Sequence, residues 1–303
     1  MNTKTICLIK IAAISFLLTI FWSASAYAQI IFQDDFESGD FLKWDFVWRD
    51  GQNPAESAEY GLDGQAVTNG GVTIGNIAPS TLRHAGNHAY QDHYAMNASG
   101  AVHNDNNHML LKRFNSPTHW FMRAYLYFAN DIKWCGATNP GSAGLQRKLI
   151  YFKGTNWDTD SSVFGFALGT WSNSGCDGVT LRLGYGGHGG MGGALDNIAL
   201  LQSGRWYSIE VEVNLATTVG NDTFRLWLDD VLIMERSDLS IQSQSDINGG
   251  IGLGQIELGR QVDRYNSNAF DEYRYWDDIT VSTTRIGPGD TLAPAAPTNL
   301  SVQ

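Results

Sequence analysis

Basic residues are scarce in this sequence, and they are not clustered in any stretch of the chain. Lys and Arg together number 20 against 31 Asp and Glu, which gives a formal charge of −11 at pH 7. Proteins that bind nucleic acid need clustered Lys and Arg to release counterions from the phosphates. We therefore expect no nucleic-acid partner, and an acidic surface of this kind needs no role beyond solubility.

Long apolar runs are also missing, except for one short run near the N-terminus. Lys4 and Lys10 precede a mainly apolar run over 11–22, and the small-x-small sequence Ala26-Tyr27-Ala28 follows it. A membrane-spanning helix needs about 20 residues, so this arrangement is typical of a signal peptide instead. We expect residues 1–28 to be removed and the mature protein to be secreted or periplasmic, with no membrane span. Its 18 basic and 31 acidic residues then give a formal charge near −13.

Cysteine is rare, because the chain has three and Cys7 lies in the expected signal peptide. Cys135 and Cys176 remain, each in a stretch rich in Gly, Ser and Asn. Thiols tend to pair in an oxidising compartment, and neither cysteine has a His or Cys at the short spacing of a metal site or catalytic dyad. We expect a disulfide that joins two loops.

No segment after the signal peptide has the period of an amphipathic helix, whereas alternation of apolar and polar residues recurs throughout. The clearest case is 206–214, where Tyr207, Ile209, Val211 and Val213 share one face. With 33 Gly and 12% aromatic residues, the chain suits many short strands joined by turns. The expected strands are 121–128, 148–153, 163–168, 179–183, 206–214, 223–228, 231–235, 251–258 and 273–281. This pattern predicts an all-β sandwich or jelly roll.

Three segments resemble the concanavalin A-like lectin and glucanase superfamily. They are Phe32-Gln33-Asp34-Asp35-Phe36-Glu37-Ser38-Gly39-Asp40 with Trp44, the hairpin from Gly204-Arg205-Trp206-Tyr207 to Leu232, and Tyr275 to Ser282. The last of them is similar to the superfamily's final strand, which lies beside the first. The resemblance implies one jelly-roll domain of two antiparallel sheets over 29–287. The Pro- and Ala-rich residues 288–303 that follow are typical of a linker or tail.

The resemblance implies no single activity, because this fold carries lectins, glycosidases, polysaccharide lyases and adhesion modules. A lyase needs a cation or amide that neutralises a uronate carboxylate, and a Tyr, His or Lys that takes the C5 proton. Arg123 and Tyr125 share one face of the strand 121–128, and Lys148 and His188 lie on nearby segments. These four are the candidate catalytic residues. The Arg-x-Glu element of such lyases is missing from the segment from His108 to Arg113.

A retaining glycosidase is a second enzyme hypothesis. Glu210, Glu212 and Asn214 alternate on one strand, so their side chains share a face. The last position should supply the acid/base, and an amide cannot shuttle a proton at neutral pH. We therefore interpret the two glutamates as a solvated strand face.

A glycan-binding module without catalysis is a further alternative, and a structural or adhesive module is another. Binding needs only aromatic side chains on which sugar rings stack. The candidates are Trp120, Tyr125, Tyr127, Trp157, Trp171 and Trp227. In every alternative except the structural one, the expected partner is an extracellular polysaccharide, bound by a monomer.

The resemblance also implies a structural Ca²⁺ between the first and last strands. Asp35, Glu37, Asp277 and Asp278 supply hard oxygen ligands on those two segments. No organic cofactor is expected.

Overall fold

A computed structural model of the protein describes residues 29–39, 41–48, 67–69, 72–74, 76–79, 84–86, 88–94, 106–107, 109–130, 132, 134, 145–155, 164–172, 177–185, 193–264 and 272–287. Several sequence predictions lie outside these residues: the signal peptide 1–28, the disulfide between Cys135 and Cys176, the roles of Trp157 and His188, and the tail 288–303.

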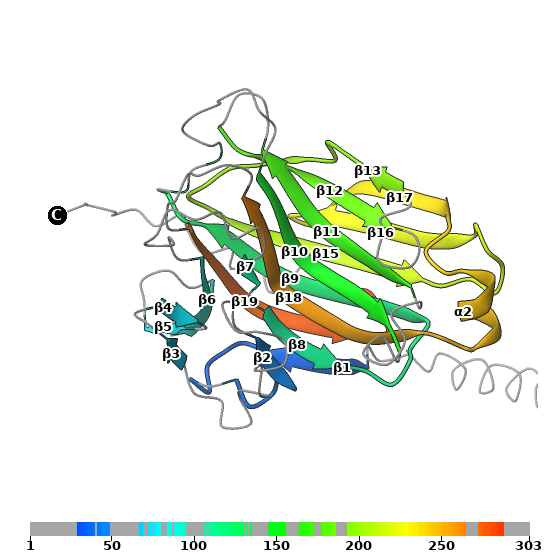
Figure 1. Ribbon diagram of the computed structural model, residues 1–303, viewed down its shortest axis with the longest axis horizontal. Coiled ribbons are helices and arrows are strands. Elements are labelled where there is room, and N and C mark those ends of the chain that lie inside the picture. The colour runs from blue at the N-terminus through cyan, green and yellow to red at the C-terminus, as the bar shows by residue number, and fades with distance from the viewer. Residues whose placement is uncertain are drawn as a thin grey trace, which may run out of the picture.

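The first of the two large antiparallel sheets, sheet A, contains both the first and the last described strands. Its strands are β1 (Ile30–Asp34), β5 (Asn76–Pro79), β6 (His88–Tyr94), β9 (His119–Phe128), β15 (Trp206–Asn214), β16 (Asp222–Leu228), β17 (Val231–Leu239) and β19 (Glu272–Ser282). Their order is β17-β16-β15-β9-β19-β6-β5, and β1 pairs with β19 beside this path (Figure 1). The first described strand therefore lies against the last, as the resemblance implies.

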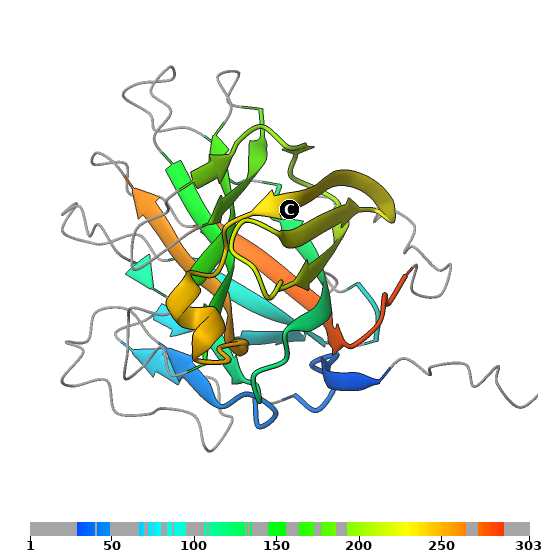
Figure 2. The ribbon, with the colours of Figure 1, turned by 90° about the vertical axis from the view of Figure 1, so that its right-hand side faces the viewer.

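The second sheet, sheet B, lies in front of sheet A in Figure 1. Its strands are β2 (Phe46–Trp48), β7 (Asn106–Asn107), β8 (Met109–Arg113), β10 (Leu145–Gly154), β11 (Gly165–Ser172), β12 (Val179–Tyr185), β13 (Gly193–Leu195), β14 (Leu200–Leu201) and β18 (Leu253–Arg264). The order is β13-β12-β11-β10-β18-β8-β2, while β14 pairs with β12 and β7 with β18. Figure 2 shows the two layers from the side.

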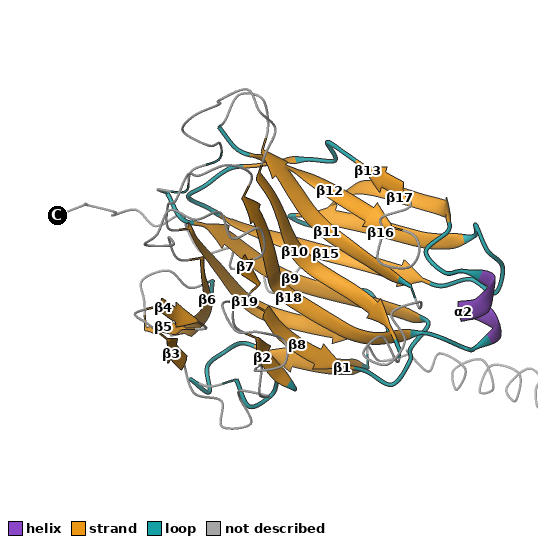
Figure 3. Ribbon diagram, viewed as in Figure 1, coloured by secondary structure: helices purple, strands orange, loops and turns teal. Residues whose placement is uncertain are grey.

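A two-stranded sheet and a short helix complete the described fold. β3 (Val67–Asn69) and β4 (Val72–Ile74) pair with each other. The helix α2 (Gln244–Asn248) lies at one end of the sandwich (Figure 3). A capping box between Ser243 and Asp246 starts it, and Gly249 and Gly250 end it within two turns. In the described part of the chain, no helix is long and apolar enough to cross a membrane.

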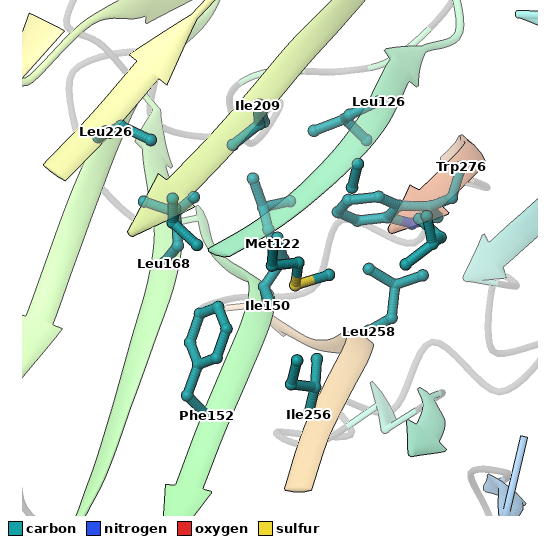
Figure 4. Close-up of a cluster of buried hydrophobic side chains, with 14 of the residues drawn as sticks. Met122, Leu126, Ile150, Phe152, Leu168, Ile209, Leu226, Ile256, Leu258 and Trp276 are labelled. Carbon is teal, nitrogen blue, oxygen red and sulfur yellow. The ribbon is translucent and has the colours of Figure 1, made fainter. Parts of the chain in front are cut away.

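The alternation predicted for the strands is confirmed, and it builds the core. Apolar residues of sheet A meet apolar residues of sheet B between the layers (Figure 4). They include Met122, Leu126, Ile209, Leu226 and Trp276 from sheet A and Ile150, Phe152, Leu168, Ile256 and Leu258 from sheet B. Each such side chain contributes about 1.5–3 kcal/mol when it is fully buried. The opposite side of each sheet, its outer face, is therefore where polar side chains can carry function.

Candidate functional site

The outer face of sheet A is engaged by the chain's own C-terminal strap, residues 284–287. Glu210 on β15 is 1% exposed, and its carboxylate accepts hydrogen bonds from the amides of Ile286 and Gly287. Arg123 on β9 donates through Nη1 to the carbonyl of Gly287 at 2.6 Å. The strap thus forms hydrogen bonds with Arg123, the residue that the sequence suggested for holding the substrate, and with Glu210 beside it.

A β-bulge in β19 holds a second segment on the same face. The register of β19 against β9 shifts after Asp277, and Asp278 has a φ of 47°. Asp277 Oδ2 accepts hydrogen bonds from the amides of His84 and Ala85 at 2.9 and 3.3 Å. Asp278 Oδ2 lies 2.6 Å from His84 Nδ1, and the His84 ring stacks on Tyr125 with the centroids 3.5 Å apart.

The titration of this face does not favour catalysis by Tyr125. Burial raises the pKa of Tyr125 and outweighs the opposing effect of the Arg123 cation. A tyrosine takes a proton more readily when its pKa is lowered toward neutral pH, and for Tyr125 the structure gives the opposite direction. Burial also raises the pKa of Asp277 to about 8, and the neighbouring charge of Asp278 adds to the rise.

Two aromatic candidates for sugar stacking are buried among other side chains. Trp120 is 0% exposed and belongs to the core, because it shares the inward face of β9 with Met122. Tyr127 is 1% exposed, and its ring lies 5.5 Å from that of Trp206 and 6.0 Å from that of Tyr275. A sugar needs an accessible ring face, so neither residue serves as a stacking platform.

Trp227 is a further aromatic candidate whose side chain is described. It is 7% exposed, and the Arg285 guanidinium of the strap lies 4.7 Å from its ring centroid. The strap therefore occupies this platform as well. The side chain of Trp171, on β11, lies outside the described residues.

The two glutamates of β15 do not form the solvated face that the sequence suggested. Glu210 is buried beneath the strap, and Glu212 is 6% exposed. Glu212 lies 2.9 Å from His119 Nε2 and accepts a hydrogen bond from Arg225 Nη1 at 2.7 Å. Alternation shows which face a residue takes, but it does not show what packs on that face.

The four acids proposed for calcium have separate neighbours. Asp35 lies 3.5 Å from Lys43 Nζ, and Glu37 accepts a hydrogen bond from the amide of His88 at 2.7 Å. The two acids of the bulge hold residues 84 and 85. Among the described residues, no group of three or more His, Cys, Asp or Glu is arranged to hold a metal ion. Calcium binding stays a prediction, which melting with calcium and with chelator would test.

The outer face of sheet B carries a polar block formed by Tyr151 and Lys153 of β10 with Gln255 and Glu257 of β18. Tyr151 lies directly across from Glu257, and Lys153 from Gln255. Lys153 Nζ lies 2.5 Å from Glu257 Oε1, and Gln255 Nε2 donates to the same oxygen at 2.9 Å. Lys153 Nζ is also 5.6 Å from the centroid of the Tyr151 ring. The four groups form one connected network.

Burying this network on the outer face of sheet B costs desolvation free energy. Lys153, Gln255 and Glu257 are 5%, 4% and 1% exposed, although they lie away from the apolar core. Desolvating an ion pair offsets most of its Coulomb attraction, so stability alone is a weak reason for such a pair. Buried charged groups beside a titratable side chain are a recurrent feature of functional sites.

Small residues lie directly beside the polar block. On β11, Gly165 lies across from Lys153, Ala167 across from Tyr151, and Gly169 across from Lys148. On β12, Gly184 lies across from Ala167. Long side chains on β10 and β18 thus border nearly bare backbone on β11 and β12. We call these four small residues the bare strip.

The sequence-predicted residues Arg123 and Lys148 do not share a site. Arg123 lies on β9 in sheet A and Lys148 on β10 in sheet B, so the core separates their outer faces. Sequence reasoning missed Lys153, Gln255 and Glu257 as a group. The available signal was the alternation of polar residues with Ile256 and Leu258 in a strand that the sequence did predict.

Comparison with solved structures finds the same fold in the endo-β-1,4-glucuronan lyase of the fungus Trichoderma reesei. The TM-score is 0.58 at 12% sequence identity, covering 84% of this chain and 96% of that chain. The cellulose-induced protein Cip1 matches with a TM-score of 0.48 at 17% identity, covering 85% of this chain and 100% of that one. A variant of the alginate lyase Aly36B in complex with alginate trisaccharide matches with a TM-score of 0.46 at 10% identity, covering 65% and 82%.

No family model matches the sequence, and no curated protein sequence matches it. The assignment therefore rests on structure. Two antiparallel sheets packed face to face, the pairing of β1 with β19, and the likeness to the glucuronan lyase show that this chain has the fold of a concanavalin A-like jelly-roll sandwich.

Proposed function

We propose that this protein is a polysaccharide lyase that acts on a uronate-containing polymer bound along the outer face of sheet B. The polar block carries the proposal, because it holds a tyrosine, a cation, a carboxylate and an amide together beside the bare strip. The outer face of sheet A is engaged by the strap and by residues 84 and 85. The fold shared with a glucuronan lyase supports the substrate class.

The chemistry assigned to the block is β-elimination. The C5 proton of the uronate leaves, the bond between C4 and the glycosidic oxygen breaks, and a double bond forms between C4 and C5. In this proposal Tyr151, which is only partly buried, takes the C5 proton and returns one to the departing oxygen. Lys153 places a fixed positive charge beside Tyr151, while Gln255 and Glu257 keep Lys153 in position.

The test is cleavage of polyglucuronate, alginate and polygalacturonate, followed by the ultraviolet absorbance of the unsaturated ends. Wild type is expected to cleave at least one polymer, and Tyr151→Phe to lose about 10²–10⁴-fold in rate while it keeps its melting temperature. Tyr273→Phe is the matched control, because Tyr273 is a partly buried tyrosine on the outer face of sheet A.

Tyr125→Phe separates this proposal from the sequence hypothesis. If that variant loses cleavage and Tyr151→Phe keeps it, the active site lies on sheet A and the proposal fails. If wild type binds one polymer but cleaves none, the elimination step is discarded and the protein is a glycan-binding module.

The proposal also places the protein outside the cytoplasm, where such polymers occur. It relies for this on export by the predicted signal peptide. Sequencing the N-terminus of the exported protein should give Gln29 as the first residue, whereas a retained Met1 would remove the signal peptide from the proposal.

A further inference from the structure

A glycine lies between two cations in one cross-strand row of sheet B. Gly169 of β11 pairs directly with Lys148 of β10 on one side and with Arg182 of β12 on the other. Residues directly opposite each other in a sheet share a face. Leu168 and Leu183, the neighbours of Gly169 and Arg182, belong to the core. The row of Lys148, Gly169 and Arg182 therefore lies on the outer face.

The glycine has a local cause. A register shift between Lys148 and Ile150 marks a bulge in β10. A Cβ at position 169 would lie 2.7 Å from the carbonyl oxygen of Arg147, so a larger residue would require the backbone to move. The consequence is bare backbone between two long cationic side chains.

The spacing suits one anionic group. Two strand separations place the Cα atoms of Lys148 and Arg182 roughly 10 Å apart. Both side chains are long enough to approach a group above Gly169 from opposite sides. Arg182 Nε lies 2.7 Å from Asp196 Oδ1, which orients the guanidinium, and the Arg182 side chain is 19% exposed.

We propose that Lys148 and Arg182 form a carboxylate subsite over Gly169, which selects a polymer with an acid group on the sugar bound there. This inference rests on the proposed function. The row lies two residues along β11 from Ala167, which is opposite Tyr151, and two residues span about 6.6 Å. The subsite thus holds the polymer beside the reacting sugar, and the two cations are specificity-determining residues.

The experiment measures binding of polyglucuronate oligosaccharides and of neutral β-1,4-glucan oligosaccharides of the same length. Binding of both probes is measured in proteins that also carry Tyr151→Phe, so that the probes are not cleaved. Lys148→Met and Arg182→Gln should each weaken binding of polyglucuronate about tenfold, as expected for a hydrogen bond to a charged group. Neither variant should weaken binding of the neutral probe.

Arg236→Gln is the matched control. Arg236 on β17 also forms an ion pair with an exposed aspartate, Asp238, but it lies at the edge of sheet A. Arg236→Gln removes one positive charge, as Lys148→Met and Arg182→Gln do, and should leave the binding of polyglucuronate unchanged. An equal loss in this control would mean that net charge, and not the subsite, governs binding.

The inference and the proposed function fail in different ways. If Lys148→Met and Arg182→Gln bind polyglucuronate as tightly as their parent, the subsite is wrong while the lyase proposal stands. If wild type neither binds nor cleaves any polyuronate, both are wrong. Melting temperatures equal to that of the parent show that a loss of binding is not a loss of fold.

Discussion

Asp277 is a buried acid whose proton links the stability of the fold to pH. Its pKa is raised from 3.8 to about 8, by burial first and by the charge of Asp278 second. Between these pH values the folded state holds a proton that the unfolded state has released, so the free energy of unfolding falls as pH rises. Asp277 therefore contributes stability in mild acid that is lost as the pH rises through about 8.

Asp277→Asn should remove this dependence. Asn keeps a carbonyl oxygen that can accept the amide hydrogen bonds of His84 and Ala85, but it cannot ionise. We expect the wild-type melting temperature to fall from about pH 6 to about pH 9, and the Asp277→Asn profile to be flatter. Asp238→Asn is the control, because Arg236 lowers the pKa of the exposed Asp238 and this acid stays ionised throughout that range. A wild-type profile as flat as that of Asp277→Asn would contradict the raised pKa.

At the scale of elements, the strap is an irregular segment that hydrogen bonds to Glu210 and Arg123 hold on sheet A. Glu210→Gln keeps the shape of the side chain but removes the charge that accepts the amides of Ile286 and Gly287. We expect a loss of about 1–3 kcal/mol in the free energy of unfolding, measured with urea. Glu235→Gln is the control: Glu235 is half exposed and pairs with Arg225, so its loss should be within about 0.5 kcal/mol. Equal losses of unfolding free energy in Glu210→Gln and Glu235→Gln would mean that the hydrogen bonds of Glu210 to the strap do not stabilise the fold.

The strands could be predicted from the sequence because alternation is a local signal. The range 206–214 coincides with β15, and 121–128 lies within β9. The same alternation, followed back from Met122, also places Trp120 in the core. Local patterns do not show which strands pair. β9 and β10 follow each other in the chain but join different sheets. Closeness in the sequence therefore groups Arg123 with Lys148, although the fold separates them.

The candidate site depends on pairing that the sequence does not reveal. Lys153 and Glu257 are far apart in the chain, and only the register of β10 against β18 brings them together. The bulges at Lys148 and at Asp277 also break the period-two pattern. Both bulges change which residues face outward, so the outer faces were less predictable than the core.

At the scale of the molecule, an acidic protein is proposed to bind an acidic polymer. The chain carries a formal charge of −11, so long-range repulsion opposes the approach of a polyuronate while the cations of sheet B act at short range. Salt screens the long-range part most, because the Debye length falls from about 30 Å at 0.01 M to about 10 Å at 0.1 M. We expect the association rate constant for polyglucuronate to rise over this range. Stopped-flow measurement of a rate that falls instead would show that the cations of sheet B steer the polymer from a distance.

The pairing of β1 with β19 brings the two ends of the described domain into contact. The amide of Thr283 donates a hydrogen bond to the carbonyl of Gln29 at 3.1 Å. A short peptide can therefore join these ends, and new termini can be opened in the tight turn at Gly220, whose φ is 84°. Such a circular permutant keeps every strand pair of both sheets and loses only the chain connection between β15 and β16. It would present the outer face of sheet B unchanged, with its ends at another edge of the sandwich.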